Sequence, residues 1–387
     1  MTFLKIAFDA VPLVGRNMSG IGWCEAGQTK AVVDLHPENE YTYNYFAGKT
    51  AAEKAERIKR FAGDRIEVRA NPFSGMFYRA FTTIFPLSYA MFFGKDCDIT
   101  HFFNYIVPPF VKGKKVVTVY DMVYKAYPET MRARTKYMLN LGLKRSMKRA
   151  DLIITISEFS KSEILKYFPE HESKIRVVPC GVDLNEFKPC EDQQKIEACR
   201  KKYKIDGDYF LYLGTLEPRK NLTNLILGYE KFIRSLPADT KAPKLVLAGG
   251  RGWLFDSIFA LVKEKHLEND VLFTEYIDSE DRTPLMCGSL AFTFPSIYEG
   301  FGMPPLEAMA CGVPVLTSDA ASLPEVTGDS AVIVKADSTD SIADGLKKLF
   351  EDGELRERLK VEGVERAKMF TWENSAKLLY KAYEELL

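Results

Sequence analysis

Short apolar runs that alternate with longer amphipathic stretches constrain this chain more than any other feature. Seven runs fill the first half: KIAFDA, YTYNYFA, RIEVRA, DITHFF, KVVTVYD, DLIITIS and KIRVVPCG. Six follow in the second half: YFLYLG, KLVLAG, VLFTEY, AFTFPS, VPVLTSD and AVIVKA. This pattern is typical of parallel strands covered by helices. The sequence therefore predicts an α/β protein with two doubly wound, Rossmann-like parallel sheets.

A charged stretch separates the two sets of runs. Residues 182–207 contain Pro189 and show little apolar periodicity beyond one short helix, so we interpret them as the link between domains. Two successive doubly wound units predict a cleft between them, with ligands bound beyond the carboxyl ends of the strands. Three amphipathic helices are expected from residue 341 to the end of the chain.

Composition argues against several classes of protein. The 53 basic and 53 acidic residues cancel, which argues against a dedicated nucleic-acid binder. Seven cysteines without a C-x-x-C pair indicate reduced thiols in a cytoplasmic protein. The start, MTFLKIAFDAVPL, resembles a first strand and not a signal peptide. The uncharged run at 80–94 is shorter than the roughly 20 residues that span a bilayer.

The segment YLGTLEPRKN, residues 212–221, places two cations after a strand. The strand ends at Gly214, and Arg219 and Lys220 lead into a helix. Adjacent cations beside a helix N-terminus suit a diphosphate. A solvated basic turn is the alternative from these residues alone.

The segment IYEGFGMPPLEAMACGVPV, residues 297–315, carries two acids around a tight loop. Gly300 and Gly302 allow a sharp backbone turn, and one of two adjacent prolines can start a helix. Glu307 would then lie in the first helical turn, where the helix dipole stabilises a carboxylate by about 0.3–1 kcal/mol. Glu299 has no such explanation, so either a ligand such as a sugar hydroxyl or another partner must balance it.

Gly20 and Gly22 open the first predicted helix, within GRNMSGIGWCEAG. Backbone N–H groups at such a point can meet phosphate, although the glycines could equally serve a tight turn. The segment is not G-x-G-x-x-G, and no clear acidic residue ends the second strand, which argues against a dinucleotide site.

Two further strand ends carry polar residues. His101 and Asn104 follow one run, and Tyr120 and Asp121 follow the next. A lone histidine is more often a packed residue than a ligand. Asp121 is either a functional acid or a helix cap.

The chain shows little sign of a metal site. Four histidines make a cluster improbable. D-x-D occurs at residues 96–98 and 206–208, but so short a motif is expected by chance.

Together these residues resemble a family 4 glycosyltransferase of the GT-B fold. The resemblance covers nearly the whole chain and is strongest in GTLEPRKN, FPSIYEGFGMPPLEAMACGVPVLTSD and SLPEVTGDSAV. The N-terminal GIG, the H-x-x-N of DITHFFN and SEFSKSEI add weaker support. The resemblance implies a retaining, metal-independent sugar transfer from a nucleotide-sugar, with no cofactor.

The resemblance also implies roles for individual residues. Glu299 would meet the donor sugar, Glu307 would hold the ribose hydroxyls, and Arg219 and Lys220 would neutralise the diphosphate. The expected catalytic set is Glu299, Arg219, Lys220 and Asp121. Glu307, Gly300, Phe301, Gly302, Gly20, Gly22 and Tyr120 are expected at the donor, and His101 and Asn104 on the acceptor side.

The family pattern predicts an N-terminal domain over residues 1–185 and a nucleotide-sugar-binding domain over 186–370. The helix at about 371–387 is expected to pack back on the N-terminal domain. One departure stands out, because many members carry His-Asp where this chain has Tyr120-Asp121. Either Tyr120 replaces the hydrogen bond of that histidine to the donor sugar, or that role has moved to another residue.

The expected donor is GDP-mannose or a related hexose or deoxyhexose nucleotide, and the expected acceptor is a glycan or lipid-linked sugar. Residues 131–150 contain seven cations and no acid. They predict either a solvated helix face over a core of Leu139, Leu143 and Met147 or peripheral contact with the inner membrane face. The aromatic stretch from Phe73 to Phe93 is predicted as a buried helix, with an acceptor wall or membrane lip as alternatives.

Two rival classes of protein fit the sequence less well. A nucleotide-dependent oxidoreductase or epimerase would need a G-x-G-x-x-G turn, which the sequence lacks. A non-catalytic sugar- or nucleotide-binding module would not need all four of Arg219, Lys220, Glu299 and Glu307.

Overall fold

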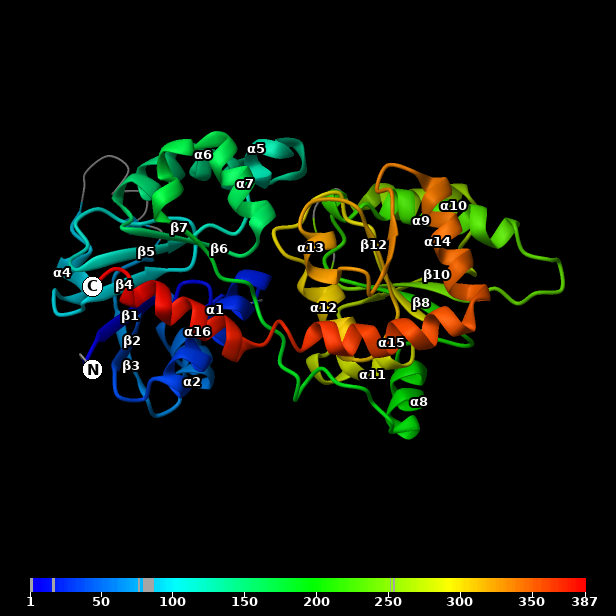
Figure 1. The fold of residues 1–387 in the computed structure, drawn as a ribbon, viewed down its shortest axis with the longest axis horizontal. Helices are drawn as coiled ribbons and strands as arrows, with labels where there is room; N and C mark the ends of the chain where they lie inside the picture. The colour runs from blue at the N-terminus through cyan, green and yellow to red at the C-terminus, as the bar shows by residue number, and fades with distance from the viewer. Residues whose placement is uncertain (1–2, 16–17, 76, 79–86, 251, 253–254) are drawn as a thin grey trace. The chain divides into compact units, whose positions relative to one another are not determined.

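The computed structural model describes every residue except 1–2, 16–17, 76, 79–86, 251 and 253–254. The chain divides into two compact units (Figure 1). Unit 1 comprises Met1–Gly181 together with Trp372–Leu387, and unit 2 comprises Val182–Thr371. The boundary predicted from the sequence falls after residue 185.

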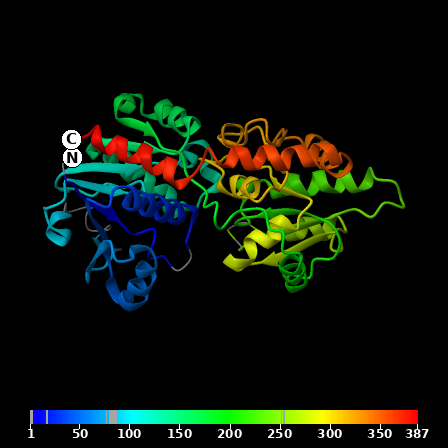
Figure 2. The ribbon, with the colours of Figure 1, turned by 60° about the horizontal axis from the view of Figure 1, so that its bottom comes forward.

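Unit 1 contains a parallel sheet with the strand order β3-β2-β1-β4-β5-β6-β7. Its strands are β1 (Lys5–Asp9), β2 (Glu40–Phe46), β3 (Ile66–Asn71), β4 (Ile99–Phe102), β5 (Lys114–Thr118), β6 (Leu152–Thr155) and β7 (Ile175–Val177). Its helices are α1 (Gly20–Leu35), α2 (Ala51–Ala62), α4 (Ala90–Phe93), α5 (Val123–Ala126), α6 (Ala133–Arg149), α7 (Glu158–Tyr167) and α16 (Trp372–Glu384). Short 3₁₀ turns are η1 (Gly48–Thr50), η2 (Pro128–Thr130) and η3 (Pro169–Lys174). Helices α1, α2 and α16 cover one face of the sheet and α6 and α7 the other (Figures 1 and 2).

The C-terminal helix α16 is an integral part of unit 1. A Cβ at Gly27 of α1 would lie 2.3 Å from the Trp372 ring, so only glycine allows this close packing. Hydrogen bonds add to it, since Gln28 Nε2 donates to Ser375 Oγ at 3.0 Å and Asn39 Nδ2 to Tyr380 Oη at 3.0 Å. The last segment of the chain therefore completes the first core.

Unit 2 contains a second parallel sheet, with the order β10-β9-β8-β11-β12-β13. Its strands are β8 (Tyr209–Leu213), β9 (Lys244–Ala248), β10 (Val271–Glu275), β11 (Ala291–Phe294), β12 (Val315–Ser318) and β13 (Val332–Val334). Its helices are α8 (Gln193–Lys202), α9 (Leu222–Arg234), α10 (Asp256–Glu264), α11 (Arg282–Cys287), α12 (Met303–Ala310), α13 (Leu323–Thr327), α14 (Thr339–Glu351) and α15 (Gly353–Ala367), with 3₁₀ turns η4 (Pro218–Lys220) and η5 (Ser279–Asp281).

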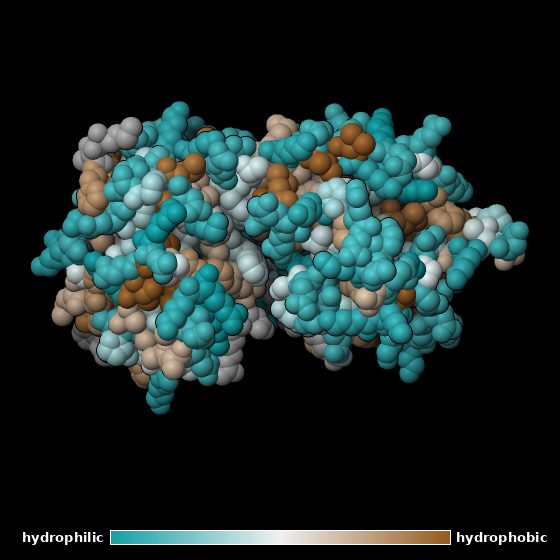
Figure 3. Space-filling model, turned by 90° about the horizontal axis from the view of Figure 1, so that it is seen from below, coloured by the Kyte–Doolittle hydropathy of each residue, from teal (hydrophilic) through white to brown (hydrophobic). Residues whose placement is uncertain are grey.

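All thirteen predicted strands and the three predicted C-terminal helices are present, so the α/β prediction is confirmed. Strands β8, β11 and β12 are buried along their whole length, as expected for a sheet covered on both faces. The surface in Figure 3 is mainly hydrophilic, and its apolar residues form small separate groups.

The predicted buried helix at residues 73–93 falls partly outside the described residues. Within the described part, Tyr89 and Phe93 are buried at α4, whereas Phe77 is 58% and Met91 77% exposed. The segment therefore combines core aromatics with exposed apolar side chains.

Candidate active site

The loop after β8 carries the predicted cations on a fixed backbone. Arg219 and Lys220 end the turn η4, and Asn221 follows with φ +62°. Asparagine tolerates this left-handed conformation better than most residues. Its side-chain amide donates to the carbonyls of Pro295 (2.9 Å) and Ala336 (2.7 Å), which fixes the loop beside β11 and β13.

The loop after β11 is held just as firmly. Gly302 adopts φ +111°, and a Cβ there would lie 2.8 Å from Leu323, so glycine is required. The hydroxyl of Ser322 donates to the carbonyls of Glu299 (2.9 Å) and Phe301 (2.8 Å). The backbone N–H of Ile297 donates to the Arg219 carbonyl at 3.0 Å and joins the two loops. The carboxyl ends of β8 and β11 therefore form one rigid edge.

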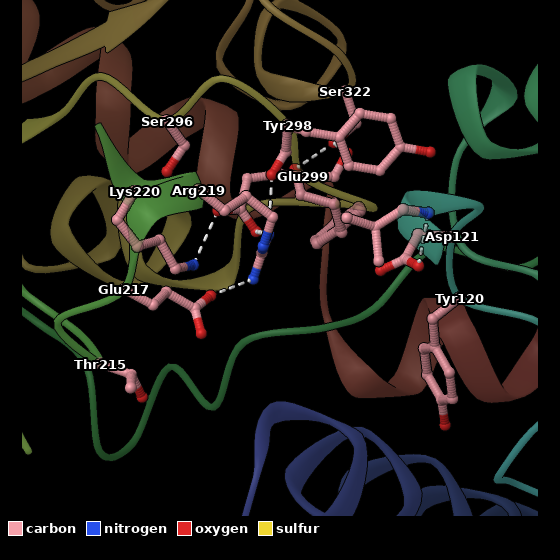
Figure 4. A network of polar contacts seen from close by, with 12 residues as sticks. Tyr120, Asp121, Thr215, Glu217, Arg219, Lys220, Ser296, Tyr298, Glu299 and Ser322 are labelled. Atoms are coloured by element: carbon pink, nitrogen blue, oxygen red, sulfur yellow. Dashed lines mark hydrogen bonds and ion pairs between the residues drawn. The ribbon is translucent and has the colours of Figure 1, made fainter. Parts of the chain in front are cut away.

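Four charges meet at this edge (Figure 4). Glu299 Oε1 accepts from Lys220 Nζ at 2.7 Å, and Glu299 Oε2 lies 2.8 Å from a terminal nitrogen of Arg219. Arg219 also donates to Glu217 Oε1 at 2.8 Å and to the Tyr298 carbonyl at 2.7 Å. The two cations and two carboxylates balance one another. Glu299 therefore has a protein partner, and the expectation that it lacks a structural explanation is wrong.

The network sets the ionisation of Glu299. Burial alone would raise the pKa of this carboxyl, but attraction and hydrogen bonds from Arg219 and Lys220 lower its pKa to about 2. Burial also lowers the pKa of Lys220, and Arg219 adds to this shift while Glu299 opposes it. The ammonium also lies 4.8 Å from the centre of the Phe294 ring, where a cation is stabilised.

Glu307 occupies a different setting from the one predicted. Helix α12 begins at Met303, so Glu307 is its fifth residue and lies beyond the first turn. The helix-dipole explanation for this acid is therefore wrong. Instead, Glu307 Oε2 accepts from a terminal nitrogen of Arg282 at 2.5 Å, and both side chains are largely buried. Burial raises the pKa of Glu307, and Arg282 opposes that shift.

Sequence comparisons identify the two halves of the chain. A family model for glycosyl transferases group 1 matches residues 195–366, and one for glycosyltransferase family 4 matches residues 38–186. The O-antigen chain mannosyltransferase B of Escherichia coli is 35% identical over 293 residues, which is 74% of each chain. The chain belongs to the family 4 glycosyltransferases.

Two further curated relatives of this glycosyltransferase are more distant. The serotype-specific mannosyltransferase WbdA of Escherichia coli is 29% identical over 66% of this chain, which corresponds to only 31% of WbdA. The O-antigen chain mannosyltransferase RfbU of Salmonella typhimurium is 29% identical over 51% of this chain and 49% of its own length.

Solved structures establish the fold as GT-B. HepE from Anabaena, in complex with UDP and glucose, matches with a TM-score of 0.74 at 17% identity, over 99% of this chain and 100% of HepE. Sucrose-phosphate synthase from Thermosynechococcus elongatus matches with a TM-score of 0.73 at 20% identity, over 98% of both chains. At these identities the likeness concerns the fold alone.

In unit 1 of the glycosyltransferase, His101 is a core residue. It is fully buried, with Nδ1 2.7 Å from the Tyr383 hydroxyl and Nε2 2.8 Å from Thr118 Oγ1. Burial lowers its pKa to about 3, so the ring is neutral. Both nitrogens are occupied by partners in β5 and α16, which contradicts the predicted acceptor-side role. Asn104 lies just beyond the end of β4, is partly exposed, and keeps its predicted role as an untested hypothesis.

Tyr120 also points into unit 1. Its ring is 5% exposed, and its hydroxyl is buried with no hydrogen-bond partner among the described residues. In Figure 4 the ring extends toward α1. Burial and the neighbouring Cys24, Cys180 and Glu25 raise its pKa. This orientation contradicts the predicted hydrogen bond from the Tyr120 hydroxyl to the donor sugar.

Asp121 lies one residue before Met122, the N-cap of α5, and its side chain accepts a hydrogen bond at the start of that helix. Its Oδ1 accepts from the Val123 backbone N–H at 3.2 Å, at the start of α5. The catalytic role predicted for Asp121 is untested.

Gly20 and Gly22 differ in what they allow. Gly20 is the first residue of α1, and a Cβ there would meet no atom within 4 Å. Gly22 is tightly packed, since its Cβ would lie 3.1 Å from the Pro12 carbonyl oxygen. The N-cap Ser19 makes no side-chain capping bond, so the first N–H groups of α1 lack that partner. Close packing thus explains why residue 22 is a glycine. It does not explain Gly20, so the predicted contact of Gly20 with phosphate stays a prediction.

The two D-x-D segments belong to surface ion pairs. Asp96 pairs with Arg69 at 3.3 Å, and Asp206 pairs with Lys244. Among the described residues, no group of three or more His, Cys, Asp or Glu side chains could hold a metal ion. Within the same residues, every helix is too short or too polar to cross a bilayer.

Sequence reasoning missed three residues of the site. Glu217 lies inside the quoted GTLEPRKN motif, so its proximity to Arg219 was a usable signal. Ser322 opens SLPEVTGDSAV but contacts Glu299 and Phe301, which lie 23 and 21 residues earlier. No sequence motif pointed to Arg282, because its pairing with Glu307 depends on how α11 packs beside α12.

Proposed function

We propose that this glycosyltransferase moves mannose, or a related hexose or deoxyhexose, from a nucleotide-diphosphate sugar to a glycan or lipid-linked acceptor. The transfer retains the anomeric configuration and needs no metal ion or cofactor. GDP-mannose is the first donor to test.

The observation that carries this proposal is the buried cation pair at the carboxyl end of β8. A departing nucleoside diphosphate gains negative charge, and two fixed cations stabilise that charge without reorganising. Lys220 Nζ has three protons, and Glu299 is its one hydrogen-bond partner among the described residues. The remaining protons are available to diphosphate oxygens.

Glu299 keeps these cations in place before the donor binds. Without it, two positive charges would be buried side by side, which is costly. When the diphosphate supplies new acceptors, the Glu299 carboxylate can accept hydrogen bonds from sugar hydroxyls instead. Glu299 is therefore proposed to hold the sugar, and Arg219 and Lys220 to stabilise the leaving group.

The names of the curated relatives support mannose and a polysaccharide acceptor. The three relatives described above are mannosyltransferases, and two of them are named for the O-antigen chain. Their acceptors are thus a reasonable guide to the acceptor class proposed here.

Peripheral contact with an anionic membrane is proposed for helix α6. Its core face is buried, as the sequence predicted, through Leu139, Leu143 and Met147. Its other face exposes 66% of Tyr137 and 40% of Leu141. The cations exposed on this helix are Arg134, Lys144, Arg145, Lys148 and Arg149. Mixed apolar and basic side chains suit an anionic headgroup layer.

Flotation with vesicles tests the membrane proposal. We expect binding to vesicles containing phosphatidylglycerol and weaker binding of Arg134→Glu/Arg145→Glu. Absence of binding at moderate salt would remove it.

A panel of nucleotide-sugars tests the transferase proposal. Without acceptor, GDP-mannose should raise the melting temperature and be slowly hydrolysed to GDP, with the same rate in EDTA. With an acceptor glycan, NMR should show that the transferred sugar has the same anomeric configuration in the product as in the donor. If no donor stabilises the protein or is hydrolysed, the proposal is wrong.

A further inference from the structure

We infer that Arg282 is a positioning residue that presents Glu307 to the ribose of the donor. This inference rests on the proposed function, together with the ribose-binding role that the family resemblance implies for Glu307. It adds a residue and a mechanism to that subsite.

Arg282 is clamped from several sides within unit 2. It is the first residue of α11, and its guanidinium donates to Glu307 Oε2 on α12 at 2.5 Å. The guanidinium carbon lies 4.8 Å from the centre of the Phe187 ring. A second terminal nitrogen lies 4.0 Å from Glu186 Oε1. The planar cation is thus fixed between a carboxylate, an aromatic face and a second acid, and its position is determined by three segments.

This clamp has an electrostatic consequence for Glu307. Burial favours the neutral form of a carboxyl group, and a neutral carboxylic acid is a poorer acceptor for hydroxyls. Arg282 opposes the effect of burial and so favours the carboxylate. The side chain of Glu307 is only 8% exposed, so the charge needs a partner of this kind.

The clamp also leaves one oxygen available. Arg282 occupies Oε2, while Oε1 makes no hydrogen bond to any residue that the structure describes. A carboxylate oxygen has two lone pairs, and a ribose presents two neighbouring hydroxyl donors. Arg282 therefore orients Glu307 so that Oε1 can receive the 2′- and 3′-hydroxyls.

The test compares nucleotides with and without these hydroxyls. GDP and 2′,3′-dideoxy-GDP are titrated calorimetrically, together with the corresponding uridine pair, against wild type and Arg282→Met. For the base that binds, wild type should prefer the hydroxylated nucleotide on the order of 10- to 100-fold, as for hydrogen bonds to a charged group. In Arg282→Met this preference should fall below about threefold, whereas the affinity for the dideoxy nucleotide stays within about twofold of wild type.

Two further variants separate positioning from folding. Arg282→Lys retains the cation and should recover part of the ribose preference. Phe187→Leu removes the aromatic face and should lower the ribose preference by a smaller factor than Arg282→Met. It is the variant to measure if Arg282→Met does not fold. Asp340→Asn, at an exposed ion pair with Lys231, is the control and should retain the preference.

Each outcome separates the inference from the function on which it rests. If Arg282→Met weakens both nucleotides equally, Arg282 only supports the fold and the inference is wrong. If wild type binds a nucleotide without any preference for the hydroxyls, the ribose role of Glu307 fails as well.

Discussion

Each unit of the molecule buries a glutamate side chain, but the surroundings favour the charged form in unit 2 and the neutral form in unit 1. Glu299 in unit 2 has Lys220 at 2.7 Å and Arg219 at 2.8 Å, and its pKa is lowered to about 2. Glu25 in unit 1 has no hydrogen-bond partner for either oxygen among the described residues. Burial, with smaller contributions from Asp9 and Cys24, raises its pKa well above 4.5.

This difference shows where the chain can use a buried charge. At the end of β8 the counter-ions are part of the same rigid edge, so Glu299 stays charged. Its ion pairs can be replaced by contacts with a ligand. On α1 the side chain is surrounded without a cation in hydrogen-bond reach, so the neutral acid is the stable form. A charged group prepared for chemistry is therefore expected in unit 2 and not at Glu25.

The largest expected effect is on the stability of unit 2. Glu299→Ala leaves Arg219 and Lys220 buried beside each other and should lower the free energy of unfolding by about 3–5 kcal/mol, as when one partner of a buried pair is removed. Denaturant unfolding measures the change. Asp340→Ala, which removes the exposed partner of Lys231, is the control and should have almost no effect.

The ion pairs of Glu299 with Arg219 and Lys220 also make the stability of the protein depend on pH. The pKa of Glu299 is lower in the folded state, so its contribution is present above about pH 4.5 and is lost as the pH falls toward 2. A Glu299→Ala variant with unchanged stability at neutral pH would show that the ion pairs contribute little.

The next effect is on turnover. Lys220→Ala removes one cation from the proposed leaving-group site and should lower kcat about 10²- to 10³-fold, the range found when one transition-state donor is removed. Steady-state kinetics with a nucleotide-sugar donor measures it. Lys231→Ala is a matched control on α9 and should retain wild-type turnover. Wild-type kcat in Lys220→Ala would contradict the role proposed for this residue.

A smaller effect is expected at Glu307, which has one cation where Glu299 has two. Glu307→Ala should weaken binding of a nucleoside diphosphate by about 10- to 100-fold with a smaller change in kcat. Calorimetric titration with GDP and UDP measures the change. An unchanged Kd together with a reduced kcat would place Glu307 in the chemical step.

The fold and part of the site could be read from the sequence, for different physical reasons. The strands were predictable because apolar periodicity is local. Arg219, Lys220 and Glu299 lie in the loops that follow β8 and β11, and these neighbouring parallel strands end at the same edge of the sheet. The Arg282–Glu307 pair could not be predicted, because it depends on the packing of two helices. Tyr120 and His101 were misjudged because a position after a strand does not fix which way a side chain points.

The remaining prediction concerns Glu25 and tests the other half of the comparison. Glu25→Gln replaces a neutral acid by a neutral amide of similar shape, so the two proteins should be equally stable below pH 4.5. In the wild type, the unfolded chain ionises near pH 4.5 while the folded chain resists, so folding loses about 1.4 kcal/mol for each pH unit up to the folded pKa. Glu25→Gln should therefore become progressively more stable than wild type as the pH rises, in denaturant unfolding measured from pH 4 to 8. A variant that is less stable than wild type at pH 8 would mean that Glu25 is ionised and paired in the folded protein. The contrast with Glu299 would then disappear, because both units would hold a charged carboxylate.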